Sequence, residues 1–193
     1  MSKLTWKPGT MLYPVPAVMV SCRHKDVDNI ITIAWAGTIC TDPAMVSISI
    51  RKNRYSYDLI KESGEFVINM PGESMAFATD FCGVRSGRDI NKFTHLNLTK
   101  VQGTKVNVPM IKECPVNIEC KLKDIIELGS HDMFLAEVIA VNVDQSLMDE
   151  NDKLNLDRAN LICYSHGEYC LVSKPIGKFG YSVKKPPKKG KKK

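Results

Sequence analysis

The sequence predicts a mainly β protein, an antiparallel barrel with a few helices. Strand-like segments outnumber helical ones and follow one another without a regular helix between each pair, which argues against a doubly wound parallel sheet. The chain has 193 residues, of which 44% are hydrophobic and 25% are charged, as in an ordinary soluble globular protein with a sizeable core. We expect residues 1–183 to form one domain, followed by a lysine-rich tail at 184–193.

The chain begins with two apolar segments. Residues Tyr13–Cys22 are apolar and β-branched enough for a strand, and Arg23–Asn29 is interpreted as the polar turn after it. Residues Ile30–Cys40 are predicted as the next strand, because β-branched residues dominate them and small residues are interleaved. Pro43 then breaks the chain.

A strictly alternating strand follows. One face carries Val46, Ile48 and Ile50, and the other carries Ser47, Ser49 and Arg51. A short helix is expected from about Ser56 to Glu62, with Gly64 as its C-terminal stop.

The rest of the chain continues this pattern. Residues 65–70 predict a strand, residues 73–83 a helix that ends at Gly83, and residues 83–93 a polar loop. Two long strands are expected at 114–128 and 132–144. In the first of these, the alternation points Val116, Ile118, Cys120 and Leu122 inward and Asn117, Glu119, Lys121 and Lys123 outward. Residues 161–172 predict one more short strand, with a turn at His166–Gly167.

The net charge of +6 comes from the end of the chain. The last ten residues hold seven lysines, and without them 20 basic residues stand against 21 acidic ones. Two prolines and a glycine make this tail a poor helix or strand, so we expect it to be disordered. A weak contact with a polyanion is the alternative, although no aromatic residue lies among the lysines to stack on bases, which makes nucleic acid an improbable partner.

Several classes of function are disfavoured. The chain contains no G-x-G-x-x-G, Walker A, G-x-S-x-G or H-E-x-x-H motif. Its seven cysteines form no C-x-x-C pair and its four histidines share no spacing, so we predict no metal site. Reduced thiols, no signal peptide and no apolar run long enough to span a bilayer favour a cytoplasmic protein without membrane contact.

Positive charge gathers where the alternating strand ends. Arg51, Lys52 and Arg54 precede Tyr55 and Ser56, at the predicted start of the helix. Arginine matches phosphate oxygens, and the N–H groups of a helix start attract anions, so this corner predicts a phosphate pocket. The alternative is an ordinary charged strand end with Ser56 as an N-cap. A second basic loop holds Arg85, Arg88 and Lys92.

Four segments, in order, resemble the flavin reductase-like, FMN-binding split-barrel family and, within it, the flavoredoxin-like branch. They are YPVPAVMVSC at 13–22, the long stretch from Asn29 to Asn69, FCGVRSGRDINKF at 81–93, and SHGEYCLVSKPIGKFGY at 165–181. The resemblance implies a split β-barrel homodimer with FMN at the barrel edge, near the subunit interface.

The resemblance also implies which residues bind FMN. Asn29, Thr32, Ala34, Trp35 and Thr38 would line the ribityl chain and isoalloxazine, and Ser49 would face the ring. Arg51, Tyr55 and Ser56 would hold the phosphate, with Ser86 and Lys92 closing over it.

Each of these side chains has a plainer interpretation. Trp35 could be a core aromatic, Thr32 a strand residue, and Lys92 a solvated loop charge. His166 is a candidate to meet a nicotinamide or an acceptor, with a turn residue as the alternative. Cys40 is expected to be a small buried hydrophobe rather than a redox thiol.

The function implied is that of an oxidoreductase that passes electrons from NADH or NADPH through FMN to free flavin, ferric iron or a redox protein. The alternative is a non-enzymatic FMN electron carrier that exchanges electrons only with protein partners. A polyanion-binding module that uses the lysine tail is a third hypothesis.

Overall fold

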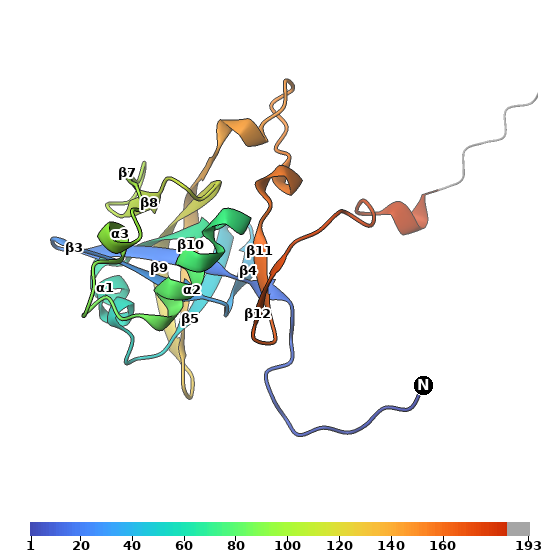
Figure 1. Cartoon of the computed structure of the whole chain (residues 1–193), viewed down its shortest axis with the longest axis horizontal. Helices are drawn as coiled ribbons and strands as arrows, with labels where there is room; N and C mark the ends of the chain where they lie inside the picture. The colour runs from blue at the N-terminus through green and yellow to red at the C-terminus, as the bar shows by residue number, and fades with distance from the viewer. Residues whose placement is uncertain (185–193) are drawn as a thin grey trace, which may run out of the picture.

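A curled antiparallel sheet of seven strands forms the body of the molecule (Figure 1). The computed structural model describes residues 1–184, so the predicted tail lies almost wholly outside the described residues. The strand order is β3-β2-β6-β9-β10-β5-β4. The bounds are β2 Val18–His24, β3 Val27–Ile33, β4 Ala36–Thr41, β5 Ala44–Ile50, β6 Glu65–Met70, β9 Val116–Glu127 and β10 Asp132–Val143. The predicted antiparallel barrel with few helices is therefore confirmed.

The barrel is split between β3 and β4. These strands are consecutive in the chain, joined only by Ala34 and Trp35, yet they form opposite edges of the sheet. The Ser49 N–H donates to the Trp35 carbonyl oxygen at 2.9 Å and ties the link to β5. The prediction of one strand over residues 30–40 was wrong, because β3 pairs with β2 whereas β4 pairs with β5, so the chain must bend between them.

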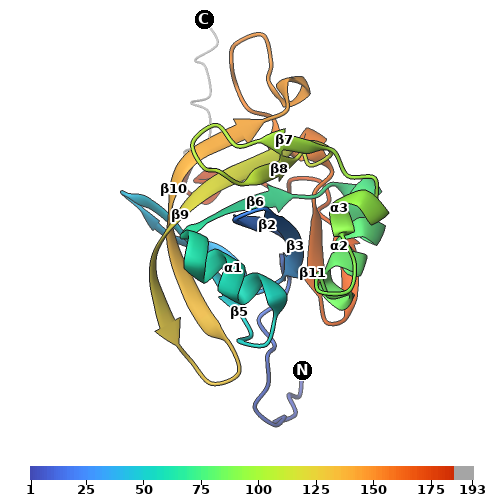
Figure 2. The same ribbon diagram turned by 90° about the vertical axis from the view of Figure 1, so that its left-hand side faces the viewer.

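The inside of the barrel is filled by one face of each strand. As predicted, Val46, Ile48 and Ile50 of β5 point inward, and Phe66 and Phe134 lie at the centre with no exposed surface. Helix α1, Tyr55–Ser63, closes one end of the barrel with its apolar face (Figure 2). It ends where expected, at Gly64, whose φ of 70° is left-handed.

A second layer covers the outer face of β2 and β3. It consists of η1 Glu73–Met75, α2 Ala76–Val84 and α3 Lys92–His95, seen beside the barrel in Figure 2. Met19 and Ile30 of the strands contact Met75, Cys82 and Phe93 of this layer. Both faces of β2 are thus buried over residues 18–22, which are apolar except for Ser21, whose hydroxyl donates to the Pro109 carbonyl oxygen at 2.6 Å.

The outer face of β9 departs from the expected pattern. Asn117 and Glu119, predicted to point outward, are buried under the β7–β8 hairpin, Lys100–Gln102 and Pro109–Ile111, and its loop. The Glu119 carboxylate accepts from the backbone N–H groups of residues 104–106, and the Asn117 side chain donates to Asn69 at 2.8 Å. Alternation marks two faces of a strand, but it cannot tell whether a distant hairpin covers the polar one.

A small sheet of β1 Val15–Pro16, β11 Ile162–Ser165 and β12 Glu168–Leu171 lies beside the split. The turn at His166–Gly167 is confirmed, although the segment forms a two-stranded hairpin and not one strand. The segments before β1 and after β12 leave the barrel on the same side, the right in Figure 1. Short 3₁₀ turns at 145–147, 156–159 and 181–183 complete the described chain. None of its helices is long and apolar enough to cross a membrane.

Candidate functional site

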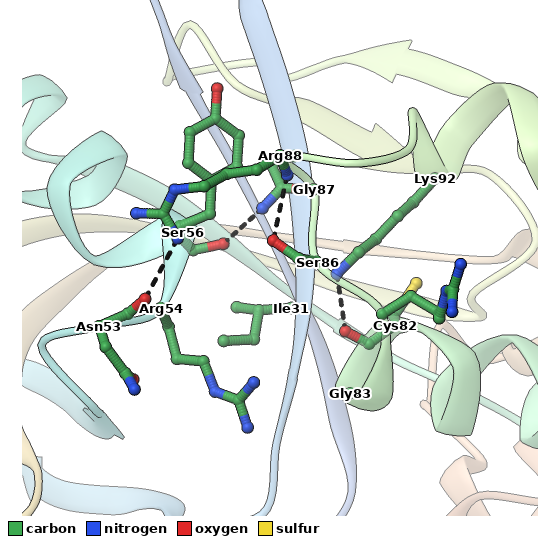
Figure 3. Close-up of a pocket in the computed structure, with 13 residues that line it drawn as sticks. Ile31, Asn53, Arg54, Ser56, Cys82, Gly83, Ser86, Gly87, Arg88 and Lys92 are labelled. Atoms are coloured by element: carbon green, nitrogen blue, oxygen red, sulfur yellow. Dashed lines mark hydrogen bonds between the residues drawn. The ribbon is translucent and has the colours of Figure 1, made fainter.

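Three adjoining cavities follow β3 to the split in the barrel. The basic cavity, about 240 Å³, is lined by Asn29, the start of α1, the loop at 85–88 and Lys92 (Figure 3). The middle cavity lies next to it and shares Ile31 and Arg54 with it. The apolar cavity shares Trp35 and its neighbours with the middle cavity.

The start of α1 gives the basic cavity free backbone donors. Arg54 occupies the N-cap position with extended backbone, and no side chain caps the helix. The first N–H groups of this nine-residue helix, at Tyr55 and Ser56, therefore contribute positive potential to the cavity that these residues line. The buried Ser56 hydroxyl accepts from the Asn29 amide at 2.9 Å, which leaves its own proton for another acceptor.

The loop after α2 closes the cavity from the opposite side. Gly87 lies so near Asn29 that an added Cβ would be 2.1 Å from the Asn29 Oδ1 atom. The Ser86 hydroxyl accepts from the Arg88 backbone N–H at 3.2 Å, and the Arg88 guanidinium donates to the Asn53 carbonyl oxygen at 3.2 Å. That guanidinium also lies 5.1 Å from the centre of the Tyr55 ring, so the loop is joined to the start of α1.

Lys92 is a buried cation at the inner wall. Its Nζ atom donates to the carbonyl oxygens of Ile30 and Cys82, at 2.6 and 2.8 Å, and the side chain points into the cavity in Figure 3. Burial lowers the pKa of Lys92. An ammonium has three donors, so one is left for a ligand. Its interpretation as a solvated loop charge is wrong, because the residue is only 4% exposed.

The charge of the basic cavity is one-sided. Arg54, Arg85, Arg88 and Lys92 line it, and within residues 1–184 no carboxylate does. Four cations that share a concave wall with free helix N–H groups form a site for a multiply charged anion.

The middle cavity, about 130 Å³, is less charged. It is lined by Thr32, Ala34, Trp35 and Ser49, together with Arg51, Arg54 and His131. The Thr32 hydroxyl donates to the Thr79 carbonyl oxygen in α2, which fixes the strand against the helix. Burial and the neighbouring Arg51 and Arg54 lower the pKa of His131.

The apolar cavity is the largest of the three, about 770 Å³, and no charged side chain of the described part of the chain lines it. One wall is the N-terminal segment at 9–12, and the other is formed by residues 34–37 with Ser47 and Ser49. The site therefore changes along its length from cationic to polar to apolar.

The structure gathers most of the predicted site residues but divides them. The basic cavity holds Asn29, Tyr55, Ser56, Ser86 and Lys92, and the middle cavity holds Thr32, Ala34, Trp35, Ser49 and Arg51. Arg51 and Ser56, expected at one phosphate, thus line different cavities, because the turn at 51–54 separates the end of β5 from the start of α1.

Two predicted residues lie apart from the cavities. Thr38 is exposed on β4 and lines none of the three. His166 is exposed at the hairpin turn, where its ring lies 5.9 Å from that of Tyr13, which in turn lies 6.1 Å from Trp35.

Four residues that line these cavities were not assigned as FMN contacts from the sequence: Arg54, Arg85, Arg88 and His131. The three arginines were visible as members of two basic segments, but only the fold shows that both segments face one cavity. For His131, at the start of β10, the sequence carries no signal.

The flavin reductase like domain model matches residues 10–173. The chain belongs to the flavin reductase-like family. The structure of flavoredoxin from Desulfovibrio vulgaris (Miyazaki F) is 32% identical, with a TM-score of 0.89 over 95% of this chain and 100% of that one.

Two sequence relatives are informative. An uncharacterized protein of Pyrococcus abyssi is 34% identical over 166 residues, which is 86% of this chain and 95% of that protein. The NADPH-flavin oxidoreductase of Streptomyces viridifaciens is 24% identical over 132 residues, 67% of each chain.

The resemblance predicted from four segments, including the flavoredoxin-like branch, is confirmed. In this flavin reductase-like protein the matched region includes all three cavities except the tip of the N-terminal segment. Within residues 1–184, no group of three or more His, Cys, Asp or Glu side chains could hold a metal ion.

Proposed function

We propose that the three cavities together bind one FMN and that the protein is an oxidoreductase. The observation that carries this proposal is the order of polarity along β3. FMN has a dianionic phosphate at one end, a polyhydroxyl chain in the middle and a flat ring at the other end. The basic, middle and apolar cavities offer cations, hydrogen-bonding groups and apolar walls in the same order.

The residues have distinct tasks in this arrangement. Arg54, Arg85, Arg88 and Lys92 would hold the phosphate, together with the free N–H groups of α1 and the hydroxyls of Ser56 and Ser86. The polar groups of Asn29, Thr32 and Ser49 would face the ribityl chain. Trp35 and the small residues beside it would form the wall against the ring. Arg51 and His131 would lie near the polar edge of the ring.

Bound FMN would supply hydride and electron transfer, so no side chain needs to act as a nucleophile. The chain would position the ring at the split, exclude water with the N-terminal segment, and leave the part of the apolar cavity beyond the ring for a donor or an acceptor. A reduced nicotinamide is our proposed donor, supported by the similarity to an NADPH-flavin oxidoreductase. Free flavin, ferric iron or a redox protein would take the electrons.

Titration with FMN and with riboflavin tests this function. FMN should bind far more tightly, because only FMN carries the phosphate that the basic cavity suits, and the purified protein should show flavin bands near one per chain. Equal affinity for the two flavins, measured by fluorescence quenching, would refute the assignment of the basic cavity.

A non-enzymatic electron carrier is the second candidate. The similarity to a flavoredoxin favours it, and so does the absence of any charged residue from the lining of the apolar cavity, where the pyrophosphate of a nicotinamide dinucleotide would find no partner. Anaerobic mixing of the flavin-loaded protein with NADH or NADPH separates the two. Rapid bleaching indicates the enzyme, and unchanged flavin absorbance indicates the carrier.

A homodimer in the cytoplasm completes the proposal. The terminal segments expose large apolar side chains, including Trp6 at 72%, Ile176 at 99% and Phe179 at 108%. The segment at 9–12 also walls the apolar cavity, so a second copy seated on these segments would lie next to the ring. All seven cysteines are free, which suits a reducing compartment.

A further inference from the structure

The β11–β12 hairpin places two cysteines directly opposite each other. Cys163 and Cys170 are partners in the antiparallel register, both free and both half-buried. Among the described strands this is the one cross-strand pair of cysteines, since Cys22 lies opposite Asn29 and Cys40 opposite Met45.

The hairpin geometry suits a bond between these two residues. His166 and Gly167 form a two-residue turn of the primed type, because both have positive φ angles, 48° and 98°. The Val172 N–H donates to the Leu161 carbonyl oxygen at 2.8 Å, so these two residues form a hydrogen-bonded pair. Hydrogen-bonded pairs recur every second residue along an antiparallel ladder, and Cys163 and Cys170 therefore form the next one. Cα atoms in these pairs lie about 5.5 Å apart, within the range found in disulfides, whereas their Cβ atoms lie about 4.5–5.5 Å apart and must approach to about 3.5–4.5 Å when the bond forms.

The two thiols share a face that the flavin site does not use. Side chains alternate along a strand, so Tyr164 and Tyr169 take the opposite face, where Tyr164 meets the Tyr13 ring and the Tyr169 hydroxyl donates to Asp80 of α2 at 3.3 Å. Burial and the nearby Cys170 raise the pKa of Cys163.

The other thiols provide a contrast. Burial raises the pKa of Cys22 and Cys120 to about 12 and that of Cys82 to about 11, and it also raises that of Cys114. Such thiols hardly ionise near neutral pH and are inert. Cys40 is half-buried like the hairpin pair, but it has no cysteine opposite, which makes it the matched control.

We propose that Cys163 and Cys170 form a reversible dithiol–disulfide site that exchanges with low-molecular-weight disulfides of the glutathione type. One thiolate attacks a sulfur of the reagent, forms a mixed disulfide and releases the first reagent thiol. The second hairpin thiol then attacks the protein-bound sulfur of the mixed disulfide and expels the second reagent thiol. Two electrons pass from the hairpin to the reagent, and both protons leave with the two thiols.

The position of the hairpin connects this chemistry to the flavin site. His166, at its turn, stacks edge-on against Tyr13, which lies beside Trp35 of the middle cavity. A cross-link two strand positions from this turn would restrict the hairpin that supports Tyr13. Strained or exposed disulfides are the readily reduced kind, and a bond between these two half-buried residues would be partly exposed, which is compatible with a reducing compartment.

Peptide mapping of the full chain tests the proposal. The reduced protein is equilibrated with mixtures of glutathione and glutathione disulfide, quenched in acid, and its remaining thiols are alkylated. Since Pro175 follows Lys174, trypsin should release residues 159–178 as one peptide that contains both cysteines and no other. We expect this peptide to lose two hydrogen atoms as the glutathione becomes oxidised. Further cleavage after Glu168 should leave its two halves linked.

Variants sharpen the test. Cys163→Ser and Cys170→Ser should each abolish the internal link and trap glutathione on the remaining cysteine, whereas Cys40→Ser should behave as wild type. A wild-type peptide that carries glutathione without an internal link, or that stays reduced throughout, would overturn the proposal. The wild-type map decides the question even where a serine variant fails to fold.

Discussion

Four cations from three segments meet in the basic cavity, and their individual positions decide what each can do. Arg54 precedes α1, Arg85 and Arg88 belong to the loop after α2, and Lys92 begins α3. Arg51 is three residues from Arg54 in sequence but lines the middle cavity only. Arg51 and Arg54 are therefore close in sequence but need not contact the same part of a ligand. Substituting them one at a time can distinguish their roles.

We expect Arg88→Ala to weaken FMN binding by roughly 10- to 150-fold, because a charge-assisted hydrogen bond is worth about 1.5–3 kcal/mol. Riboflavin, which lacks the phosphate, should lose little. Arg51→Ala should weaken both flavins alike, since Arg51 lies beside the proposed ring and not beside the phosphate. Fluorescence titration of both flavins into both variants checks this. If Arg51→Ala instead removed the preference for FMN, the original assignment of Arg51 to the phosphate would be restored.

Gly87 offers a steric test of the same cavity. In Gly87→Ala the new methyl group would lie 2.1 Å from the Asn29 Oδ1 atom, so the loop or Asn29 must shift. Because Asn29 holds Ser56, we expect weaker FMN binding as well as a lower melting temperature. Gly129→Ala is the matched control, since nothing lies within 4 Å of its added Cβ. Equal effects of the two substitutions would show that the close approach of Gly87 is unimportant.

At the scale of elements, polar anchors hold loops onto the sheet. Glu119, with no exposed surface, accepts hydrogen bonds from residues 104–106 and from Asn142 at 2.7 Å. Burial raises its pKa, but the hydrogen bonds from Thr104, Lys105 and Asn142 outweigh burial and lower the pKa to about 2. The loop between β7 and β8 is thus fixed by an ionised carboxylate.

This anchor makes stability depend on pH. The unfolded chain protonates an ordinary glutamate near pH 4.3, whereas folded Glu119 protonates only near pH 2. Its contribution is therefore complete above about pH 4.3 and is lost as the pH falls toward 2. We expect Glu119→Gln to lower the free energy of unfolding by about 1–3 kcal/mol at pH 7, and by much less near pH 2. Urea unfolding at several pH values measures this, with Glu137→Gln as control. A cost that does not change with pH would contradict the assignment.

The sequence predicted an element correctly where only one face of it is buried or where a specific residue ends it. The alternation in β5 identified its inner face, and Gly64 identified the end of α1. The prediction failed where contacts with segments distant in the sequence determine the structure. The bend at Ala34–Trp35 depends on pairing with β2 and β5, and the burial of Asn117 depends on the β7–β8 hairpin. For the site, residue types and order suggested an anion, but only the fold brings Arg88 beside Tyr55.

At the scale of the whole molecule, the terminal segments are unusually exposed for their composition. Leu12, Ile176 and Phe179 are almost fully or fully exposed, and the segments project from the same side of the barrel (Figure 1). Burying such side chains stabilises an assembly by about 1.5–3 kcal/mol each.

We therefore expect a dimer of twice the 21.6 kDa chain mass by light scattering. Phe179→Asp should shift the protein toward monomer and weaken FMN binding in parallel. Phe77→Asp, on the exposed face of α2 and 76% exposed, serves as the control and should leave the mass unchanged. A wild-type monomer that binds FMN tightly would contradict the dimer.

The split between β3 and β4 affects how often the barrel opens to solvent. The two edge strands are joined by only two residues, Ala34 and Trp35, and within the described residues no strand ladder pairs β3 with β4, so separation of these edges would open a route for solvent to the interior. A flavin bound along β3 and against β5 would contact both sides of this seam. By mass action, a ligand at 100 times its Kd makes the open form about 100-fold rarer. Amide protons of β3 and β4 should then exchange with solvent correspondingly more slowly when FMN is present, so the cofactor would also protect the chain from proteases.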